Sequence, residues 1–202
     1  MHRNFFPGRF IVLEGLDKAG KTTQARNLAE YLEKLGYQVV QTAEPTKGKV
    51  GSLIRKVLSG EILMDSRTLQ LLFTADRSEH LEKVIRPALD KGKVVISDRY
   101  FYSTLAYGSI DLDVSWLFKV NRFALSPDLT IFIDVPPDVC LKRLKKEQSK
   151  QELFEKKEQL QKVRKTYLNL VQNFPEMIVV DGMGNQKEVF TQIEYWVKRK
   201  LG

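Results

Sequence analysis

Gly15-Leu16-Asp17-Lys18-Ala19-Gly20-Lys21-Thr22 is the stretch that decides the fold of this chain. It fits the pattern G-x-x-x-x-G-K-[ST] without a mismatch, it follows the apolar run 9–14, and it opens the helical pattern 20–35. Glycines let backbone N–H groups turn inward around a phosphate, and the helix that follows directs its positive end at the same group. We therefore predict a phosphate-binding loop (P-loop) between a buried strand and a helix.

The loop pattern also predicts how the chain binds ATP and Mg²⁺. Lys21 is expected to bridge the β- and γ-phosphates, and the hydroxyl of Thr22 to ligate the Mg²⁺ ion that accompanies ATP. The alternative is a chance match, in which Gly15 ends a strand and Lys21 is a solvated helix residue. The predicted ATP contacts from this segment are Gly15, Leu16, Asp17, Lys18, Ala19, Gly20, Lys21, Thr22 and Thr23.

A second strand is expected to supply the other metal ligand. The apolar run 94–97 ends in Asp98, the acidic partner expected beside a P-loop. Asp98 is predicted to ligate Mg²⁺ through water or to position the acceptor. A different role for Asp98 is to cap the helix that begins at Phe101, and both roles can hold at once.

The rest of the chain alternates between apolar runs and helical patterns, which predicts an α/β fold. Continuously apolar strands favour a five-stranded parallel sheet with helices on both faces, and we expect a single domain over 1–202. Ligands bind such sheets beyond the carboxyl ends of the strands, so the loops at Gly15, Glu44, Asp98 and Asp134 should share one rim. The expected strands are 9–14, 37–42, 94–97, 129–133 and 177–180. The expected helices are 20–35, 50–58, 68–89, 101–107, 114–125, 136 to about 172, and 187–200.

Composition excludes some classes of protein and leaves others open. The 202 residues carry a net charge of +8, which suits a protein that handles phosphates but equally a solvated helix face. Cys140 is the only cysteine, so no intrachain disulfide can form, which fits a reducing cytoplasm; we interpret it as a buried small apolar residue. No apolar run approaches the roughly 20 residues of a membrane span. An Asn-Lys-x-Asp motif for guanine is absent from the sequence, which disfavours a GTPase.

Four segments, in order over nearly the whole chain, resemble the thymidylate kinases. That resemblance implies transfer of the ATP γ-phosphoryl group to dTMP, with Mg²⁺, by a cytoplasmic homodimer whose small lid spans approximately 144–156. The segments are Ile11 to Gln24, Leu72-Phe73-Thr74-Ala75-Asp76-Arg77, the run from Asp98-Arg99-Tyr100 through Ser103 to Ala106-Tyr107, and Pro127 to Asp134.

The resemblance implies a role for each acceptor-binding residue. Phe73 would stack on thymine, Arg77 would donate to its O4, and Arg99 would hold the acceptor phosphate. Tyr107 would close the space beside C2′ of the sugar, and Asp17 would bind the 3′-hydroxyl. Further implied contacts with dTMP are Glu44, Pro45, Arg55, Ser103 and Thr104. From spacing alone, Phe73 could instead be a core residue, and Arg77 could form a surface ion pair with Asp76 or Glu79.

The resemblance leaves two candidates for the cation that stabilises the transferring group. Lys18 occupies a loop position where some thymidylate kinases carry arginine, and the lid here has lysines but no arginine. Arg143, at the edge of the lid, could act in the same way or stack on adenine. The chain departs from many relatives at Ala43, where arginine is frequent, and at Gly108, where glutamine is frequent. The resulting catalytic set is Lys18, Lys21, Asp98 and Arg99.

Two other functions compete with this interpretation. The chain could phosphorylate another nucleoside monophosphate or a deoxynucleoside. It could also be a non-catalytic protein that binds ATP or nucleic acid, for which exposed aromatic and basic residues would interleave on one face. The aromatic residues instead fall within patterned helices, so we expect neither nucleic acid nor a membrane as a partner.

Overall fold

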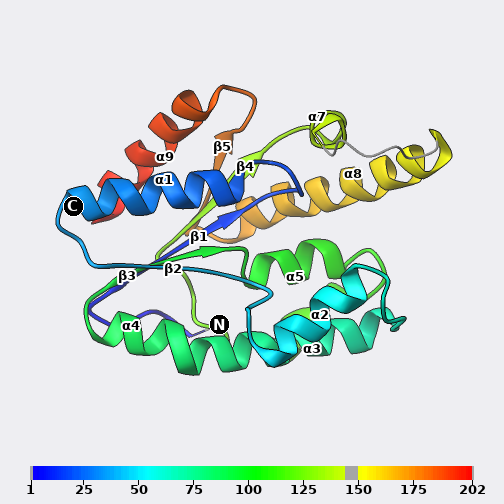
Figure 1. Cartoon of the computed structure of the whole chain (residues 1–202), viewed down its shortest axis with the longest axis horizontal. Helices are drawn as coiled ribbons and strands as arrows, with labels where there is room; N and C mark the ends of the chain where they lie inside the picture. The colour runs from blue at the N-terminus through cyan, green and yellow to red at the C-terminus, as the bar shows by residue number, and fades with distance from the viewer. Residues whose placement is uncertain (1, 144–149, 202) are drawn as a thin grey trace.

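The computed structural model describes residues 2–143 and 150–201, except for the side chains of 150–155 and 201. Its centre is one five-stranded sheet in the order β2-β3-β1-β4-β5, and every neighbouring pair is parallel (Figure 1). The predicted five-stranded parallel sheet is confirmed. The strands are β1 (Arg9–Glu14), β2 (Val39–Ala43), β3 (Val94–Asp98), β4 (Leu129–Asp134) and β5 (Met177–Asp181).

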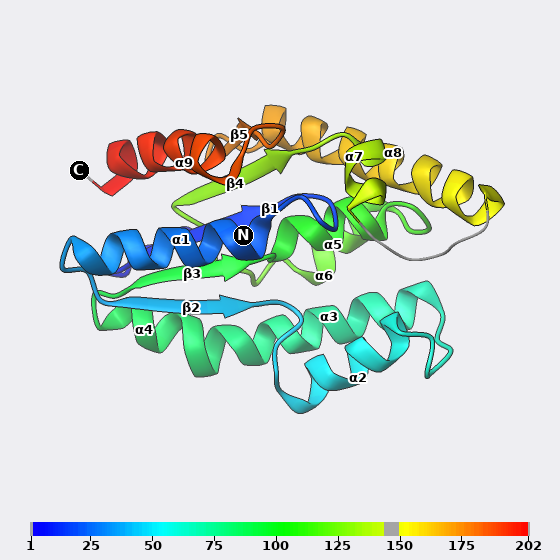
Figure 2. The same ribbon diagram turned by 45° about the horizontal axis from the view of Figure 1, so that its top comes forward.

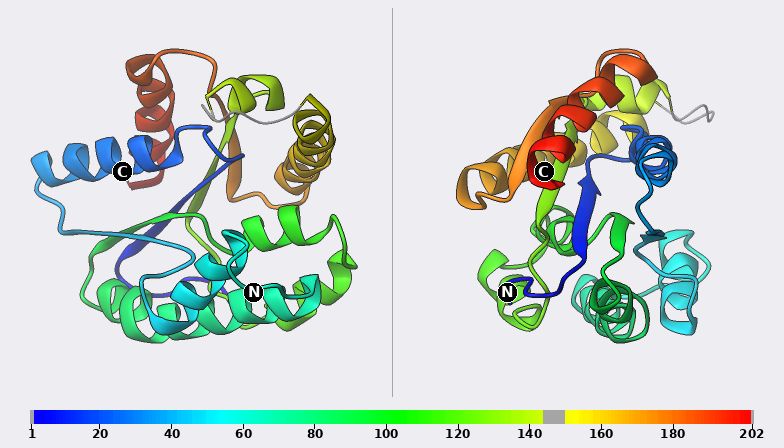
Figure 3. Two further views of the ribbon diagram at one scale, coloured as in Figure 1. Left: turned by 45° about the vertical axis from the view of Figure 1, so that its right-hand side comes forward. Right: turned by 90° about the vertical axis from the view of Figure 1, so that its left-hand side faces the viewer.

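Helices cover both faces of this sheet. α1 (Lys21–Lys34) and α9 (Gln186–Leu201) pack on each other and on the strands from one side (Figure 2). A second, longer layer of helices packs on the opposite side of the sheet. The two views in Figure 3 show the strands between these layers. The remaining helices are α2 (Lys49–Leu58), α3 (Ser66–His80), the π-helical turn η1 (Leu81–Ile85), α4 (Arg86–Asp90), α5 (Phe101–Gly108), α6 (Val114–Val120), α7 (Pro137–Lys142) and α8 (Lys150–Asn173).

The core follows from the apolar strands. In β1, β3 and β4 almost every residue is buried, because both faces of these central strands lie under helices. The edge strands are more exposed: β5 mixes buried and exposed residues, and every residue of β2 is half-buried or exposed. The carboxyl ends of β1, β3 and β4 therefore converge on one rim with a rigid base beneath them. No helix in the described part of the chain is both long and apolar enough to cross a membrane.

Three helices differ from their predicted extents. The pattern from 136 to about 172 begins with α7, which ends at Lys142, and α8 spans Lys150–Asn173, with 144–149 outside the described residues. The pattern 68–89 is a helix from Ser66 that passes through the π-helical turn Leu81–Ile85. Pro87 explains the irregular turn, because it has no N–H to donate and its ring would clash with the carbonyl of Lys83 in a regular helix. The pattern 114–125 ends at Val120, where Asn121 caps the helix and turns inward.

Replacing Ile131 by alanine should lower the free energy of unfolding by about 2–5 kcal/mol, because Ile131 is fully buried in β4 and the substitution leaves a cavity. Its register partner in β5, Ile178, is only partly buried and provides the matched control. Urea denaturation should show a smaller loss for Ile178→Ala than for Ile131→Ala. Equal losses would contradict the layered core described above.

Candidate nucleotide-binding site

The P-loop has the predicted setting, between β1 and α1. Gly15 has φ 154°, and a Cβ there would lie 2.9 Å from the carbonyl oxygen of Ile133, so only glycine fits without a shift. Gly20 has φ 103° at the start of α1. Lys18 also has a positive φ, 67°, which is a strained conformation for a residue with a side chain. Strain of this kind concentrates at ligand-binding loops.

Lys21 is buried beneath the loop. Its Nζ donates to the carbonyl oxygen of Leu16 at 2.8 Å. Burial, helped by the nearby Arg99, lowers the pKa of Lys21 to about 8, although Asp98 and Asp17 oppose the shift. An anionic ligand at this position would stabilise the charged form of Lys21. The alternative of a solvated helix lysine is wrong, because Lys21 is buried.

Thr22 and Asp98 meet across the space between α1 and β3. The hydroxyl of Thr22 donates a short hydrogen bond to Oδ2 of Asp98. The capping alternative for Asp98 is wrong, because the N-cap of α5 is Tyr100 and no side chain caps it. A hydroxyl and a carboxylate side by side are oxygen donors of the kind that Mg²⁺ prefers.

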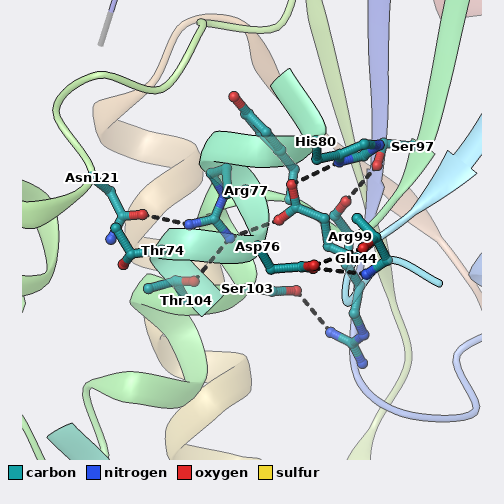
Figure 4. A network of polar contacts seen from close by, with 12 residues as sticks. Glu44, Thr74, Asp76, Arg77, His80, Ser97, Arg99, Ser103, Thr104 and Asn121 are labelled. Atoms are coloured by element: carbon teal, nitrogen blue, oxygen red, sulfur yellow. Dashed lines mark hydrogen bonds and ion pairs between the residues drawn. The ribbon is translucent and has the colours of Figure 1, made fainter. Parts of the chain in front are cut away.

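Arg99 is fixed in a specific orientation at the end of β3. Its backbone has φ 70°, and its carbonyl oxygen accepts from Oγ of Ser97 at 2.7 Å. The guanidinium donates to Oδ1 of Asp17 at 2.5 Å. It also donates to Oγ of Ser103 at 2.8 Å (Figure 4). It also lies 5.0 Å from the ring centroid of Tyr107 and donates to its hydroxyl. Three predicted acceptor contacts thus surround one arginine.

A buried carboxylate supports Arg99 from below. Glu14 is fully buried and accepts from the backbone N–H of Tyr100 and Ser103, the hydroxyl of Ser103 and the hydroxyl of Tyr167, at 2.6–3.1 Å. Burial raises the pKa of Glu14, and Arg99 and these donors oppose that rise. Ser103 therefore donates to Glu14 and accepts from Arg99, so Glu14 positions the guanidinium through it.

Arg77 forms a second buried centre. Its guanidinium donates to Oε2 of Glu44 at 2.8 Å, to Oδ1 of Asn121 at 2.5 Å and to Oγ1 of Thr104 at 3.0 Å (Figure 4). Nδ1 of His80 forms a hydrogen bond with the other carboxylate oxygen of Glu44, Oε1, at 3.0 Å. The surface ion pair proposed as an alternative for Arg77 is wrong, since its side chain is 1% exposed and its partner is Glu44.

Arg55 binds to the loop after β2 and does not line the pocket beside Arg77. Asp76 accepts from the backbone N–H and the hydroxyl of Thr46. Arg55 is exposed and donates to the carbonyl oxygens of Pro45 at 3.1 Å and Thr46 at 2.5 Å. It lines the neighbouring groove together with Thr22, so a contact between Arg55 and the acceptor stays a prediction.

Between the two arginines lies a pocket of about 250 Å³, which we call the acceptor pocket. Phe73 is half-buried on its wall, so the interpretation of Phe73 as a core residue is not supported. A flat aromatic face, two guanidinium groups and mostly apolar surroundings suit a planar anionic ligand. The predicted acceptor residues that line this pocket are Asp17, Glu44, Pro45, Phe73, Arg77, Arg99, Ser103, Thr104 and Tyr107.

The predicted lid is described only in part. Residues 144–149 lie outside the described residues, and 150–156 form the beginning of α8. Arg143 donates to the carbonyl oxygen of Lys18 at 3.1 Å, which brings the two candidate cations to the same loop. Cys140 is buried, as interpreted from the sequence, and burial raises the pKa of its thiol to about 11.

Several functional residues escaped the sequence analysis. Glu14 had a visible signal, because it is a charged residue at the end of an apolar run. Asp76 and His80 belong to the amphipathic pattern of α3 and gave no distinct signal. Asn121 and Tyr167 come from distant elements and meet the site only in the folded chain.

Comparisons with known proteins agree with this geometry. Residues 13–193 match the family model described as thymidylate kinase. The chain is 47% identical over 201 residues to a probable thymidylate kinase of Pyrococcus horikoshii, covering 96% of this chain and 98% of the relative. It is 48% identical over 202 residues to one of Thermococcus onnurineus, with 95% and 98% covered, and 38% identical over 190 residues to one of Methanocaldococcus jannaschii, with 94% and 95% covered.

Replacing Lys21 by methionine should stabilise the nucleotide-free protein, because the substitution removes a buried ammonium group. Below pH 8, Lys21 is protonated in both the folded and the unfolded chain, so the folding of the wild type bears the full free-energy cost of burying a charged ammonium group. Between its folded pKa of about 8 and its ordinary value of 10.5, the unfolded chain binds the extra proton, so wild-type stability rises with pH.

The stability difference between Lys21→Met and the wild type should therefore be largest below pH 8 and shrink toward pH 10.5. Urea denaturation without nucleotide, repeated across this range, measures the difference. The exposed Lys34 in the last turn of α1 provides the control, since Lys34→Met should show no such pH dependence. A stability difference that stays constant with pH would contradict the lowered pKa of the buried Lys21.

Proposed function

The chain belongs to the thymidylate kinase family, and from this premise we propose that it transfers the γ-phosphoryl group of ATP to dTMP, giving dTDP and ADP. The observation that carries the proposal is the acceptor pocket, which opens beside the P-loop and has Arg99 and Arg77 at its wall with Phe73 on the same lining. Asp17 lies in the P-loop and also lines the acceptor pocket, so the two sites adjoin.

On the donor side, the loop amides and Lys21 would hold the triphosphate of ATP. Thr22 and Asp98 would hold Mg²⁺, which neutralises phosphate charge and aligns the donor when it is bound. Within the described residues, no cluster of three or more histidine, cysteine, aspartate or glutamate side chains could hold a metal ion. This fits a magnesium site completed by phosphate oxygens and water.

On the acceptor side, Arg99 would grip the phosphate of dTMP and Arg77 would donate to O4 of thymine. Phe73 supplies an apolar face for the ring, and Tyr107 would lie beside C2′ of the sugar. Asp17 would bind the 3′-hydroxyl at the cost of part of its contact with Arg99. The pocket thereby addresses the base, the sugar and the phosphate separately.

Catalysis would rest on charge neutralisation and alignment. Both reactants are anions, so preorganised cations between them stabilise the charge on the transferring group. Lys21, Lys18 and Arg99 lie around the junction of the two sites, and Glu14 fixes Arg99 before substrate arrives. Arg143, which contacts the backbone of Lys18, would reinforce that cation or contact adenine.

The structure gives less support to the other two functions. A kinase for a different nucleotide would need another arrangement at the base end, where Arg77 is locked by Glu44 and Asn121. A nucleic-acid-binding protein would present aromatic side chains to solvent, whereas Tyr100, Phe101 and Tyr102 are fully buried.

The sharpest test is an acceptor panel with ATP and Mg²⁺. We expect dTMP to be phosphorylated with a higher kcat/KM than dUMP, dCMP or thymidine, in a coupled assay of ADP release. Lys21→Met should lower kcat by roughly 10³-fold or more, because it removes a cation from the transferring phosphoryl group, while the fold persists in circular dichroism. Preference for another acceptor, or full activity of the variant, would overturn the proposal.

A homodimer in the cytoplasm completes the proposal. The neighbouring helices α2, α3 and α6 leave large apolar side chains exposed, which favours a second copy as their cover. These side chains are Leu58, Leu71, Val114 and Phe118.

Leu71→Glu should convert the dimer to a monomer, since a charge at 45% exposed Leu71 would be desolvated in the interface. Light scattering coupled to gel filtration measures the mass directly. Tyr195→Glu introduces the same charge on α9, at an exposed aromatic residue away from these helices, and should leave the dimer intact. A wild-type mass of 23.3 kDa would contradict the dimer.

A further inference from the structure

Tyr167 is a buried tyrosine of α8 that lies behind Arg99 and outside the lining of the acceptor pocket. Its hydroxyl lies 2.8 Å from Oε2 of Glu14 and 2.9 Å from Oγ of Ser103. Burying a hydroxyl costs free energy unless the group is hydrogen-bonded. The role of this hydroxyl therefore has to be sought in what it does to Glu14 and Ser103.

The hydroxyl of Ser103 has one hydrogen and two lone pairs, and its neighbours determine how these are used. An ionised Glu14 can only accept, so it takes the serine hydrogen across 2.6 Å. Arg99 can only donate, so its Nη1 uses one lone pair of Ser103 at 2.8 Å. Tyr167 occupies another side of the same oxygen. With these three neighbours in place, Ser103 cannot turn away from Arg99 without losing hydrogen bonds.

The ring of Tyr167 contacts the second group that holds Arg99. The guanidinium of Arg99 lies 5.0 Å from the ring centroid of Tyr107 and donates to its hydroxyl. The rings of Tyr107 and Tyr167 meet edge to face, with their centroids 6.5 Å apart. Tyr167 also stacks on Phe132 of β4, with the centroids 4.8 Å apart. One side chain of α8 therefore contacts both Ser103 and Tyr107, the two residues of α5 that bind the guanidinium.

α8 is itself fixed to the end of β4 one turn before Tyr167. Nε of Arg164 donates to Oδ1 of Asp134 at 2.6 Å, and its Nη2 donates to Oδ2 at 2.7 Å. Two parallel hydrogen bonds between an arginine and a carboxylate fix orientation as well as distance. The hydroxyl of Tyr167 therefore reaches Glu14 and Ser103 from a helix that is held in place.

We propose that Tyr167 is a positioning residue that aligns Arg99 with the phosphate of the acceptor, through Ser103 with its hydroxyl and through Tyr107 with its ring. This inference rests on the proposed function, in which Arg99 binds that phosphate. Because Tyr167 acts through Arg99, its hydroxyl matters only to a ligand that carries the phosphate. Thymidine has the base and sugar of dTMP but no phosphate, so the two ligands separate this role from a general effect on the pocket.

The test compares Tyr167→Phe with the wild type, because phenylalanine keeps the ring contacts and removes only the hydroxyl. Isothermal titration calorimetry gives the Kd of dTMP and of thymidine. The preference for dTMP over thymidine should fall by about 10-fold, because a guanidinium that is free to move aligns poorly with the phosphate. The Kd of thymidine and the KM of ATP should stay unchanged. Tyr102→Phe is the matched control, since it removes another buried tyrosine hydroxyl, which donates to Glu176, and should keep the preference.

Two further variants follow the same route. Ser103→Ala removes the group on which the Tyr167 hydroxyl acts, so adding Tyr167→Phe to it should cost much less of the preference than in the wild type. Should Tyr167→Phe fail to fold, Phe132→Leu keeps the hydroxyl but withdraws its stacking partner, and it should lower the same preference.

The outcomes separate the inference from the proposed function. If the wild type prefers dTMP over thymidine and the variants of Tyr167 and Phe132 keep that preference in full, Tyr167 is only a packing residue and the inference falls. An equal loss from Tyr102→Phe would overturn it as well. If the wild type binds thymidine as tightly as dTMP, the proposed function fails instead.

Discussion

The carboxylate of Glu14 sets the strongest constraint on this structure. Its side chain is fully buried where β1 ends, and an uncompensated charge there would cost several kcal/mol. Its hydrogen bonds come from the backbone before and within α5, from Ser103 and from Tyr167 in α8. β1, α5 and α8 therefore have to pack so that Glu14 keeps these hydrogen bonds. The same arrangement orients Arg99, so the stability of the fold and the geometry of the site have a common cause.

The two arginines of the pocket are held by different means, which suits their different tasks. Arg77 is buried, and its two terminal nitrogens are held by side chains from the loop after β2, from α5 and from the end of α6, which fixes the position of the guanidinium. Arg99 is partly exposed and bound to Asp17, whose side chain is largely solvent-accessible. A phosphate dianion could therefore take the place of Asp17 beside Arg99, because the carboxylate of Asp17 already lies in solvent. The strained backbone at Arg99 and Lys18 places both cations where a relaxed chain would not.

Local patterns predicted much of this molecule. The P-loop, the five strands and the rim at their carboxyl ends follow from a motif and from apolar runs, because parallel strands under two helical layers leave a clear record in sequence. Resemblance then pointed to the pocket residues, and all but Arg55 line one pocket. The network of Glu44, His80 and Asn121 was not predictable, since these partners lie far apart along the chain and each residue type is common on helix surfaces. The π-helical turn before Pro87 was missed because the apolar periodicity runs through it.

α5 and α3 come very close at Gly108, because a Cβ there would lie 3.2 Å from Cδ of Gln70. Many thymidylate kinases carry glutamine where this chain has Gly108, and the space that such a side chain would enter is bounded here by the carboxamide from α3. A side chain at position 108 would require the carboxamide or the side chain of Leu117 to shift. Such a contact would couple the sizes of the side chains at positions 70 and 108, so a larger residue in α5 would call for a smaller one in α3.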